Sequence, residues 1–242
     1  MYKTLKGVAK RLIHSTGFEV TRLTPMSDPA LHFLKSLERF KIDLVFDVGA
    51  NIGQFSSELR SVGYKGRIVS FEPLTIAYTE LAKASRNDPA WSVHQRCAIG
   101  DQDGEIEINI SGNSVSSSVL PMTELCSTTA VDAAYVGSEK VMIRRLDSVA
   151  TDYFAASNFP FLKIDTQGFE WQVLDGAKGI LPEIRGVLCE LSFDVLYKEQ
   201  HLWFETLKRL EGEGFTLWSI QPVFVDPRNG RTLQVDATFF RL

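Results

Sequence analysis

Two hydrophobic patterns alternate along most of the chain. Short runs of consecutive apolar residues, as at residues 44–48 and 160–165, predict buried strands, and segments with apolar residues at helical spacing follow most of them. Repeated strand–helix units require right-handed crossovers, which predict a largely parallel α/β sheet covered by helices on both faces. Ligands of such a sheet bind beyond the C-terminal ends of its strands.

The same patterns predict where the individual elements lie. A C-terminal hairpin closes the chain, which implies one antiparallel edge strand on the parallel sheet. Residues 111–118 show no periodicity, so they form either a substrate-side lid or a flexible connection. Asp147 is placed to cap the helix that follows the strand at 141–146. Strands are predicted at residues 44–48, 67–72, 91–98, 104–110, 141–146, 160–165, 185–191, 215–220 and 235–242, and helices at 53–62, 74–85, 169–176 and 201–211.

Residues 1–40 precede this pattern and are predicted to be a helical extension, with the main domain at residues 41–242. Leu5, Val8 and Leu12 recur at helical spacing among lysines and arginines, which predicts a basic amphipathic helix. One interpretation is attachment to an anionic membrane surface. We favour the other, in which the helix packs on the domain or on a second subunit of a homo-oligomer.

Composition narrows the class of protein. The 242 residues, of which 44% are hydrophobic and 23% charged, have an ordinary globular composition and can bury a substantial core. The net charge of -4 argues against a general nucleic-acid binder, because phosphate binding needs accumulated lysine and arginine. No apolar run reaches the roughly 18 residues of a membrane span. Cys97, Cys126 and Cys189 form no CxxC pair, so a reducing, cytoplasmic setting fits best.

The turn after the first predicted strand is the first candidate binding site. Gly49 lets the backbone turn close to a ligand, and Gly53 lets the next helix start close to the strand. Asn51 stands where a dinucleotide-binding turn prefers glycine, but asparagine tolerates a positive φ. Asp47 would repel a pyrophosphate and suits a cationic ligand instead. A purely structural turn is the alternative.

Glu72 supports the binding interpretation. It lies at the end of the second predicted strand, directly before Pro73. An acid at that place in an α/β fold can accept hydrogen bonds from both hydroxyls of a ribose. The alternative is a surface acid at a strand end. Together with the turn after the first strand, Glu72 predicts a site for a cationic nucleoside.

Several short motifs occur in an order that resembles the FkbM-type family of S-adenosylmethionine-dependent methyltransferases. They cover roughly residues 40 to 200, and the ordered set is more specific than any one motif. The matching pieces are Asp47-Val48-Gly49-Ala50-Asn51-Ile52-Gly53, Phe71-Glu72-Pro73, Cys97-Ala98-Ile99-Gly100-Asp101, Arg145-Leu146-Asp147-Ser148, Leu162-Lys163-Ile164-Asp165-Thr166-Gln167-Gly168-Phe169-Glu170 and Glu190-Leu191-Ser192-Phe193.

This resemblance implies a fold, a cofactor and an acceptor. The fold is the Rossmann-like class I methyltransferase fold with seven strands, and the acceptor is a hydroxyl of a saccharide, glycolipid or natural product. The cofactor's amino acid part is expected at residues 47–53, its ribose at Glu72 and its adenine at residues 97–101. The candidate cofactor-binding residues are Asp47, Gly49, Ala50, Asn51, Gly53, Glu72, Pro73, Cys97, Ala98, Asp101 and Asp165.

Two acids at strand ends are the main catalytic candidates. Lys163 and Asp165 point to the same face of their strand, and a lysine in so apolar a strand needs a partner, for which Asp165, Glu190 or Asp47 could serve. Asp165 and Glu190 could deprotonate or orient an acceptor hydroxyl, directly or through a divalent cation. A structural ion-pair network with Lys163 is the alternative.

The histidines add one further candidate. His201 begins the helix predicted at 201–211 and could act as a general base near neutral pH, although a surface or partly buried histidine is the simpler interpretation. His14, His32 and His94 show no mutual spacing that indicates a metal site.

The sequence therefore predicts methyl transfer from S-adenosylmethionine to a hydroxyl oxygen. No Asn/Asp-Pro-Pro-Tyr/Phe segment follows Asp165, which disfavours the amino-methylating enzymes that use one. An NAD-dependent oxidoreductase or epimerase is disfavoured because the turn is G-x-N-x-G and no Tyr-x-x-x-Lys pair occurs. A third hypothesis is a non-catalytic module that keeps the cofactor-binding fold.

Overall fold

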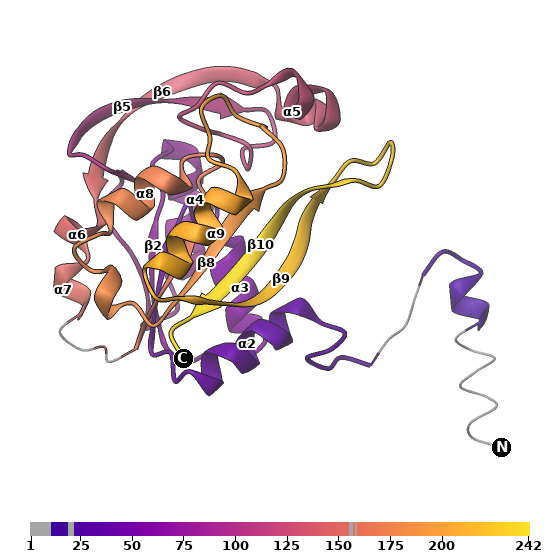
Figure 1. Ribbon diagram of the computed structural model, residues 1–242, viewed down its shortest axis with the longest axis horizontal. Helices are drawn as coiled ribbons and strands as arrows, with labels where there is room; N and C mark the ends of the chain where they lie inside the picture. The colour runs from indigo at the N-terminus through magenta and orange to yellow at the C-terminus, as the bar shows by residue number, and fades with distance from the viewer. Residues whose placement is uncertain (1–10, 19–21, 155–156, 158) are drawn as a thin grey trace.

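A single seven-stranded sheet organises the computed structural model, which describes residues 11–18, 22–154, 157 and 159–242. The strand order is β3-β2-β1-β7-β8-β10-β9 (Figure 1). β10 is antiparallel to both of its neighbours, and the remaining pairs are parallel, as predicted. The strands are β1 (Leu44–Val48), β2 (Arg67–Phe71), β3 (Trp91–Val93), β7 (Pro160–Ile164), β8 (Gly186–Ser192), β9 (Thr216–Val225) and β10 (Thr232–Phe240).

The position of the antiparallel strand differs from the prediction. β10 lies between β8 and β9, so the edge of the sheet is the parallel strand β9. The crossover from β8 to β9 leaves the width of one strand open, and β10 fills that gap. Its backbone then bonds on both sides, which satisfies N–H and C=O groups of two neighbours instead of one.

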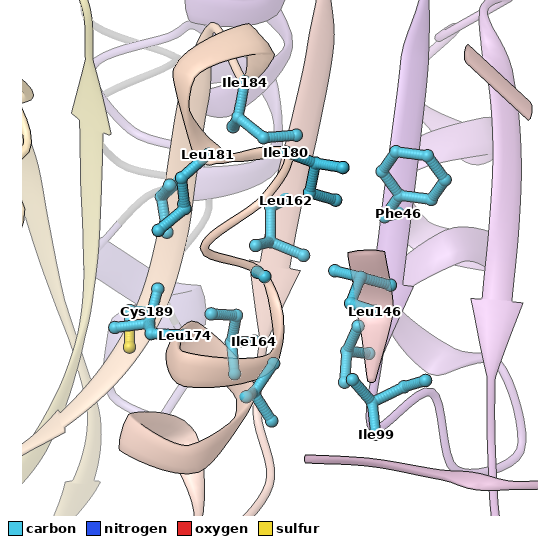
Figure 2. Packing of buried hydrophobic residues seen from close by; sticks show 14 of the residues in the cluster. Phe46, Ile99, Leu146, Leu162, Ile164, Leu174, Ile180, Leu181, Ile184 and Cys189 are labelled. Carbon is cyan, nitrogen blue, oxygen red and sulfur yellow. The ribbon is translucent and has the colours of Figure 1, made fainter. Parts of the chain in front are cut away.

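Helices cover both faces of the sheet, as the alternating pattern predicts. The side chains of α2, α3 and α4 pack on one face with Val45 and Phe161, and those of α6, α8 and α9 pack on the other with Phe46 and Leu162. Figure 2 shows this second face, where Phe46 and Leu146 lie opposite Leu162 and Ile180. The helices are α2 (Pro29–Arg39), α3 (Gln54–Ser61), α4 (Thr75–Ser85), α5 (Glu124–Thr129), α6 (Leu146–Val149), α7 (Thr151–Phe154), α8 (Glu170–Gly176) and α9 (Trp203–Gly212), with 3-10 turns η1 (Val131–Ala133) and η2 (Leu181–Glu183).

Strand alternation decides where the charged residues of the core lie. Val45 and Phe161 face α2, α3 and α4, so Asp47 and Lys163, two positions further along the same strands, face the same way. The register pairs Asp47 directly with Lys163. The two charged side chains are therefore neighbours inside the sheet.

A second, three-stranded sheet was not predicted. It contains β4 (Ala98–Gly100), β6 (Tyr135–Arg145) and β5 (Gly104–Ser111), in that order, and lies at the top of the molecule in Figure 1. The single strand expected at residues 91–98 is divided, because β3 pairs with β2 whereas β4 pairs with β6. The alternation of Ile106, Ile108 and Ile110 buries one face of this sheet against Phe169.

Three local predictions can be compared with the structure. The basic helix predicted around residues 5–13 lies mostly outside the described residues, of which 11–14 are helical. Asp147 does not cap α6; it pairs with Arg145 at 2.7 Å, because the helix begins one residue earlier than expected. In the described part of the chain, no helix is long and apolar enough to cross a membrane.

Candidate active site

A cavity of about 280 Å³ lies at the C-terminal ends of β1, β2 and β7. The small sheet closes its far side through Ala98 and Ile108, and Phe71, Leu74 and Phe169 add apolar walls. Most of the predicted cofactor residues line it, namely Gly49, Ala50, Asn51, Glu72, Pro73, Cys97, Ala98 and Asp165. Asp47, Gly53 and Asp101 do not.

The turn after β1 has the backbone geometry that its residues predict. Gly49 has φ 76°, and a Cβ atom there would lie 1.8 Å from the carbonyl oxygen of Asp165, so no larger residue fits. Asn51 has φ 47°, and its Oδ1 accepts a hydrogen bond from the backbone N–H of Ile52 at 2.7 Å. The turn thus brings backbone groups to the cavity wall.

Gly53 serves packing instead of binding. It has φ 91°, and an added Cβ would lie 2.9 Å from the indole ring of Trp91 and 3.0 Å from Leu81. The missing side chain lets α3 start close to β3 and α4. The expected close approach of helix and strand is present, but the residue faces the protein interior.

Glu72 lies at the cavity with both carboxylate oxygens engaged. Its Oε2 accepts from the backbone N–H of Asn51 at 2.8 Å, and its Oε1 accepts from that of Leu74 at 2.9 Å. Burial raises its pKa to about 7, although these two N–H groups oppose the shift. Each oxygen keeps a second lone pair, so the carboxylate can still accept from a ligand hydroxyl.

Asp101 is remote from the cavity. It is exposed and begins the turn after β4, where its backbone carbonyl accepts from Nη1 of Arg145 at 2.8 Å. Gly100, the last residue of β4, packs against Ile143 and Phe169 and ends the part of this segment that faces inward. The structure therefore does not bring Asp101 to the predicted adenine site, because β4 ends one residue too early.

Asp47 is fully buried and contacts Lys163. Nζ of Lys163 lies 3.1 Å from Oδ1 of Asp47 and 3.6 Å from Oδ2 of Asp165, and it donates to the carbonyl of Gly49 at 3.0 Å. Oδ2 of Asp47 accepts from Ser56 at 2.7 Å. Although burial opposes it, these carboxylates hold the pKa of Lys163 above its usual value.

This ion pair changes the role expected for Asp47. Lys163 lines the cavity, whereas Asp47 is fully buried and does not, so Asp47 would influence a ligand only through Lys163. Of the partners that the sequence left open for the lysine, Asp47 and Asp165 are within 4 Å.

Gln167 connects the two catalytic candidates, and the sequence did not indicate it. Its Nε2 donates to Oδ1 of Asp165 at 2.9 Å and to Oε2 of Glu190 at 2.8 Å. Its Oε1 accepts from the hydroxyl of Tyr197 at 2.7 Å. Gln234, from the last strand, donates to the same Glu190 oxygen at 2.7 Å. The only signal in the sequence was a polar residue two positions after a strand-end acid.

A second cavity, of about 290 Å³, adjoins the first. Its walls come from the acids and amides just described, from the loop after β5 and from the β9–β10 hairpin. Asp165, Gln167 and Val115 line both cavities. The remaining lining residues are Asn113, Ser116, Cys126, Ala130, Glu190, Tyr197, Val223, Phe224 and Gln234.

The loop at residues 111–118 is held over both cavities. Asn51 Nδ2 and Ser114 Oγ are 3.4 Å apart, and the Tyr197 hydroxyl, which donates to Gln167, also lies 3.3 Å from the carbonyl oxygen of Ser116. Ser118 Oγ donates to the carbonyl of Gln167 at 2.6 Å. Of the two roles left open for this loop, its contacts favour the substrate-side one.

His201 lies away from both cavities. Its ring stacks on Trp171 with the centroids 3.9 Å apart, and Nδ1 is 3.3 Å from Oε1 of Glu205. It precedes α9, on the face of the sheet opposite to Lys163, so the fold does not bring it to Asp165. Among the described residues, no three His, Cys, Asp or Glu side chains are placed to hold a metal ion.

Several carboxyl groups around Asp165 have raised pKa values. Burial, with Asp165 and Glu170 nearby, raises the pKa of Glu190 well above its usual value. Burial also raises the pKa of Glu170 and of Asp236 to about 7. The raised pKa favours the neutral form of Glu190, which can donate a hydrogen bond, more than it would be favoured in an exposed glutamate.

These raised values predict how stability depends on pH. The folded protein holds protons on Glu72 and Glu170 that the unfolded chain releases near pH 4.5, so the free energy of unfolding falls as pH rises to about 7. Each group contributes up to about 3 kcal/mol. Urea denaturation of the ligand-free protein at pH 5.5 and pH 8 will measure the difference. Glu170→Gln, which keeps an acceptor oxygen but cannot titrate, should reduce it; equal stabilities at both pH values in the parent protein would contradict the prediction.

Comparison with known proteins identifies the family of the chain. A family model of the methyltransferase FkbM domain matches residues 47–217. One relative, the 31-O-demethyl-FK506 methyltransferase FkbM of Streptomyces tacrolimicus, is 30% identical over 208 residues, which cover 75% of this chain and 76% of that protein. Another, methyltransferase sdnD of Sordaria araneosa, is 24% identical over 190 residues, which cover 62% of this chain and 73% of that protein.

A solved structure supports the fold alone. The N-terminal domain of human METTL16 in complex with SAH superposes with a TM-score of 0.50 at 10% identity, covering 92% of this chain and 73% of that one. The sequence family and the seven-stranded sheet lead to the same conclusion, with S-adenosylmethionine as the expected cofactor. The chain belongs to the FkbM family of S-adenosylmethionine-dependent methyltransferases.

Proposed function

We propose that this protein methylates a hydroxyl of a saccharide, glycolipid or natural-product acceptor. The observation that carries the proposal is the pair of adjoining cavities, with Asp165 and Gln167 in the wall of both. A donor in the first cavity and an acceptor in the second would meet at Asp165. Holding the two in line can supply roughly 7–11 kcal/mol of the barrier.

The residues of the first cavity fit S-adenosylmethionine. Ala98, Leu74 and Phe169 form apolar walls suited to a flat base, and Glu72 is placed to accept from ribose hydroxyls. Asp165, at the far end, supplies negative charge for an ammonium or sulfonium group. When bound, the cofactor supplies a methyl group on a positively charged sulfur.

The chain's own part in the reaction is to position and deprotonate the acceptor. Oδ2 of Asp165 lies 3.6 Å from the Lys163 ammonium, and its Oδ1 accepts from Gln167. Asp165 would take the proton of the acceptor hydroxyl as the oxygen attacks. Glu190, which is held by the side-chain amides of Gln167 and Gln234, would form a hydrogen bond with a second hydroxyl of the acceptor.

Oxygen is the favoured acceptor atom for two reasons. The relative from Streptomyces tacrolimicus is named for an O-methylation, and it covers three quarters of this chain. The turn after β7 carries Asp165-Thr166-Gln167-Gly168, without the proline pair that amino-methylating enzymes use.

Calorimetric titration with S-adenosylhomocysteine and with NADH will test the cofactor site. We expect binding of the first compound only. Glu72→Gln replaces one of the two side-chain oxygens that accept from backbone N–H groups and cannot carry a negative charge, so it should weaken binding of S-adenosylhomocysteine at least tenfold. Asp101→Asn, at an exposed position outside the cavity, is the control and should bind like the parent protein.

Mass spectrometry on a panel of hydroxyl and amine acceptors will test the reaction. We expect a 14 Da gain on a hydroxyl-bearing compound and none on its amine analogue. Binding of S-adenosylhomocysteine without transfer to any hydroxyl would instead favour the non-catalytic module.

A further inference from the structure

Four polar side chains form a row across the sheet at its C-terminal edge. Asp236 of β10 pairs with Glu190 of β8 on one side and with Gln221 of β9 on the other. Asp165 follows Ile164, which pairs with Cys189, so it lies beside Glu190. Paired residues share a face, and this row faces α2 and α3. The row thus extends two strands beyond the proposed acceptor cavity.

A third cavity, of about 290 Å³, lies along the outer half of this row. It is enclosed by α2, α3 and the β9–β10 hairpin, and its walls are mostly apolar, including Ala30, Phe33 and Phe55. Val223 borders both this cavity and the second one, and Phe55 borders both this cavity and the first. The three spaces are therefore neighbours around the site of transfer.

Asp236 stands at the boundary between the polar and apolar spaces. Its carboxyl group lines the third cavity and forms no hydrogen bond with any residue that the structure describes. Glu190, by contrast, is held by two amide groups. Because its carboxyl group lies at this cavity and no other side chain holds it by a hydrogen bond in the described part of the chain, Asp236 is a candidate contact for a polar group of a ligand.

We propose that the third cavity binds the apolar body of the acceptor, so that the substrate is an amphiphile. This inference rests on the proposed hydroxyl methylation. The hydroxylated end would lie between Asp165 and Glu190, a further polar group would reach Asp236, and the hydrocarbon part would lie against Ala30, Phe33 and Phe55. A free, fully polar sugar would leave these walls uncovered.

Ligand-observed NMR with S-adenosylhomocysteine present will test the inference without requiring turnover. The probes are methyl β-D-glucoside and hexyl β-D-glucoside, both below micelle-forming concentrations. Each buried methylene strengthens binding about fourfold, so the hexyl compound should bind at least tenfold more tightly, with saturation transfer to its chain. Equal affinities, or no binding of the hexyl compound, would overturn the inference.

Two variants locate the binding. Ala30→Trp fills the cavity and Ser219→Asp places a charge in its wall; both residues line the third cavity and neither of the other two. Each should abolish the advantage of the hexyl chain and leave S-adenosylhomocysteine affinity unchanged. Ala84→Trp, on the exposed side of α4, is the control.

The outcomes separate this inference from the proposed function. Persistent hexyl preference in both variants would show that the chain binds elsewhere and would overturn the inference alone. Hexyl binding in the third cavity without transfer to any hydroxyl would count against the proposed reaction instead.

Discussion

Replacing Asp165 with asparagine is expected to lower turnover by about 10²–10⁴-fold, the usual contribution of a general base. Asparagine has nearly the same shape, and its Oδ1 can still accept from Gln167. The amide cannot take a proton from the acceptor hydroxyl. The affinity for S-adenosylhomocysteine should change only a few-fold. Steady-state kinetics with the best acceptor and calorimetric titration will measure the two quantities.

Glu190→Gln is the matched control for this prediction. Glutamine keeps the shape of Glu190 and one acceptor oxygen, and its amide can donate a hydrogen bond, so it preserves most of the positioning role proposed for this residue. Turnover should fall by a much smaller factor than in Asp165→Asn. Unchanged turnover in Asp165→Asn would return that acid to a structural role beside Lys163.

Removing Asp47 is expected to destabilise the protein by about 3–5 kcal/mol, as is usual when one partner of a buried ion pair is lost. In Asp47→Ala, the ammonium group of Lys163 keeps only the more distant carboxylate of Asp165, at 3.6 Å. The expectation from the sequence that Asp47 binds the cofactor would imply lost cofactor binding with the fold retained. Urea denaturation should instead show a lower midpoint with an unchanged slope.

A double variant distinguishes the effect of breaking the ion pair from the effect of the cavity that the missing Asp47 side chain leaves. Asp47→Ala with Lys163→Met removes both charges and should recover much of the lost stability. Ser56→Ala, which removes one hydrogen bond to Asp47, should cost only about 1 kcal/mol. Equal stabilities of Asp47→Ala and the parent protein would show that Lys163 finds another partner.

The site was predicted best where its parts are contiguous in sequence. The turn at Gly49 and Asn51 depends on φ values that these residues tolerate by themselves, and Glu72 follows directly from the end of β2. Asp101 was a candidate because of the motif resemblance, and His201 because of its chemistry at the start of a predicted helix. Whether these two side chains reach the cavity depends on where β4 ends and on which face of the sheet α9 packs against, and neither is a local property of the sequence.

The hydrogen bonds of Gln167 and Gln234 to Glu190 could not be predicted either, because they also depend on tertiary structure. Glu190 meets Gln167 across neighbouring strands and meets Gln234 because β10 inserts between β8 and β9. That insertion also creates the row from Asp165 to Gln221. A one-residue change of register would turn these side chains to the opposite face.

The sequence by itself determined the alternating strands and helices, the turn after β1 and the acids at the ends of β2, β7 and β8, because hydrophobic periodicity and backbone tolerance are local. Tertiary structure alone decided that Asp47 lies behind Lys163, that Gln167 joins Asp165 to Glu190 and that two cavities adjoin at Asp165 and Gln167. These contacts join residues up to 116 positions apart in the chain, and only the order and register of the strands bring them together.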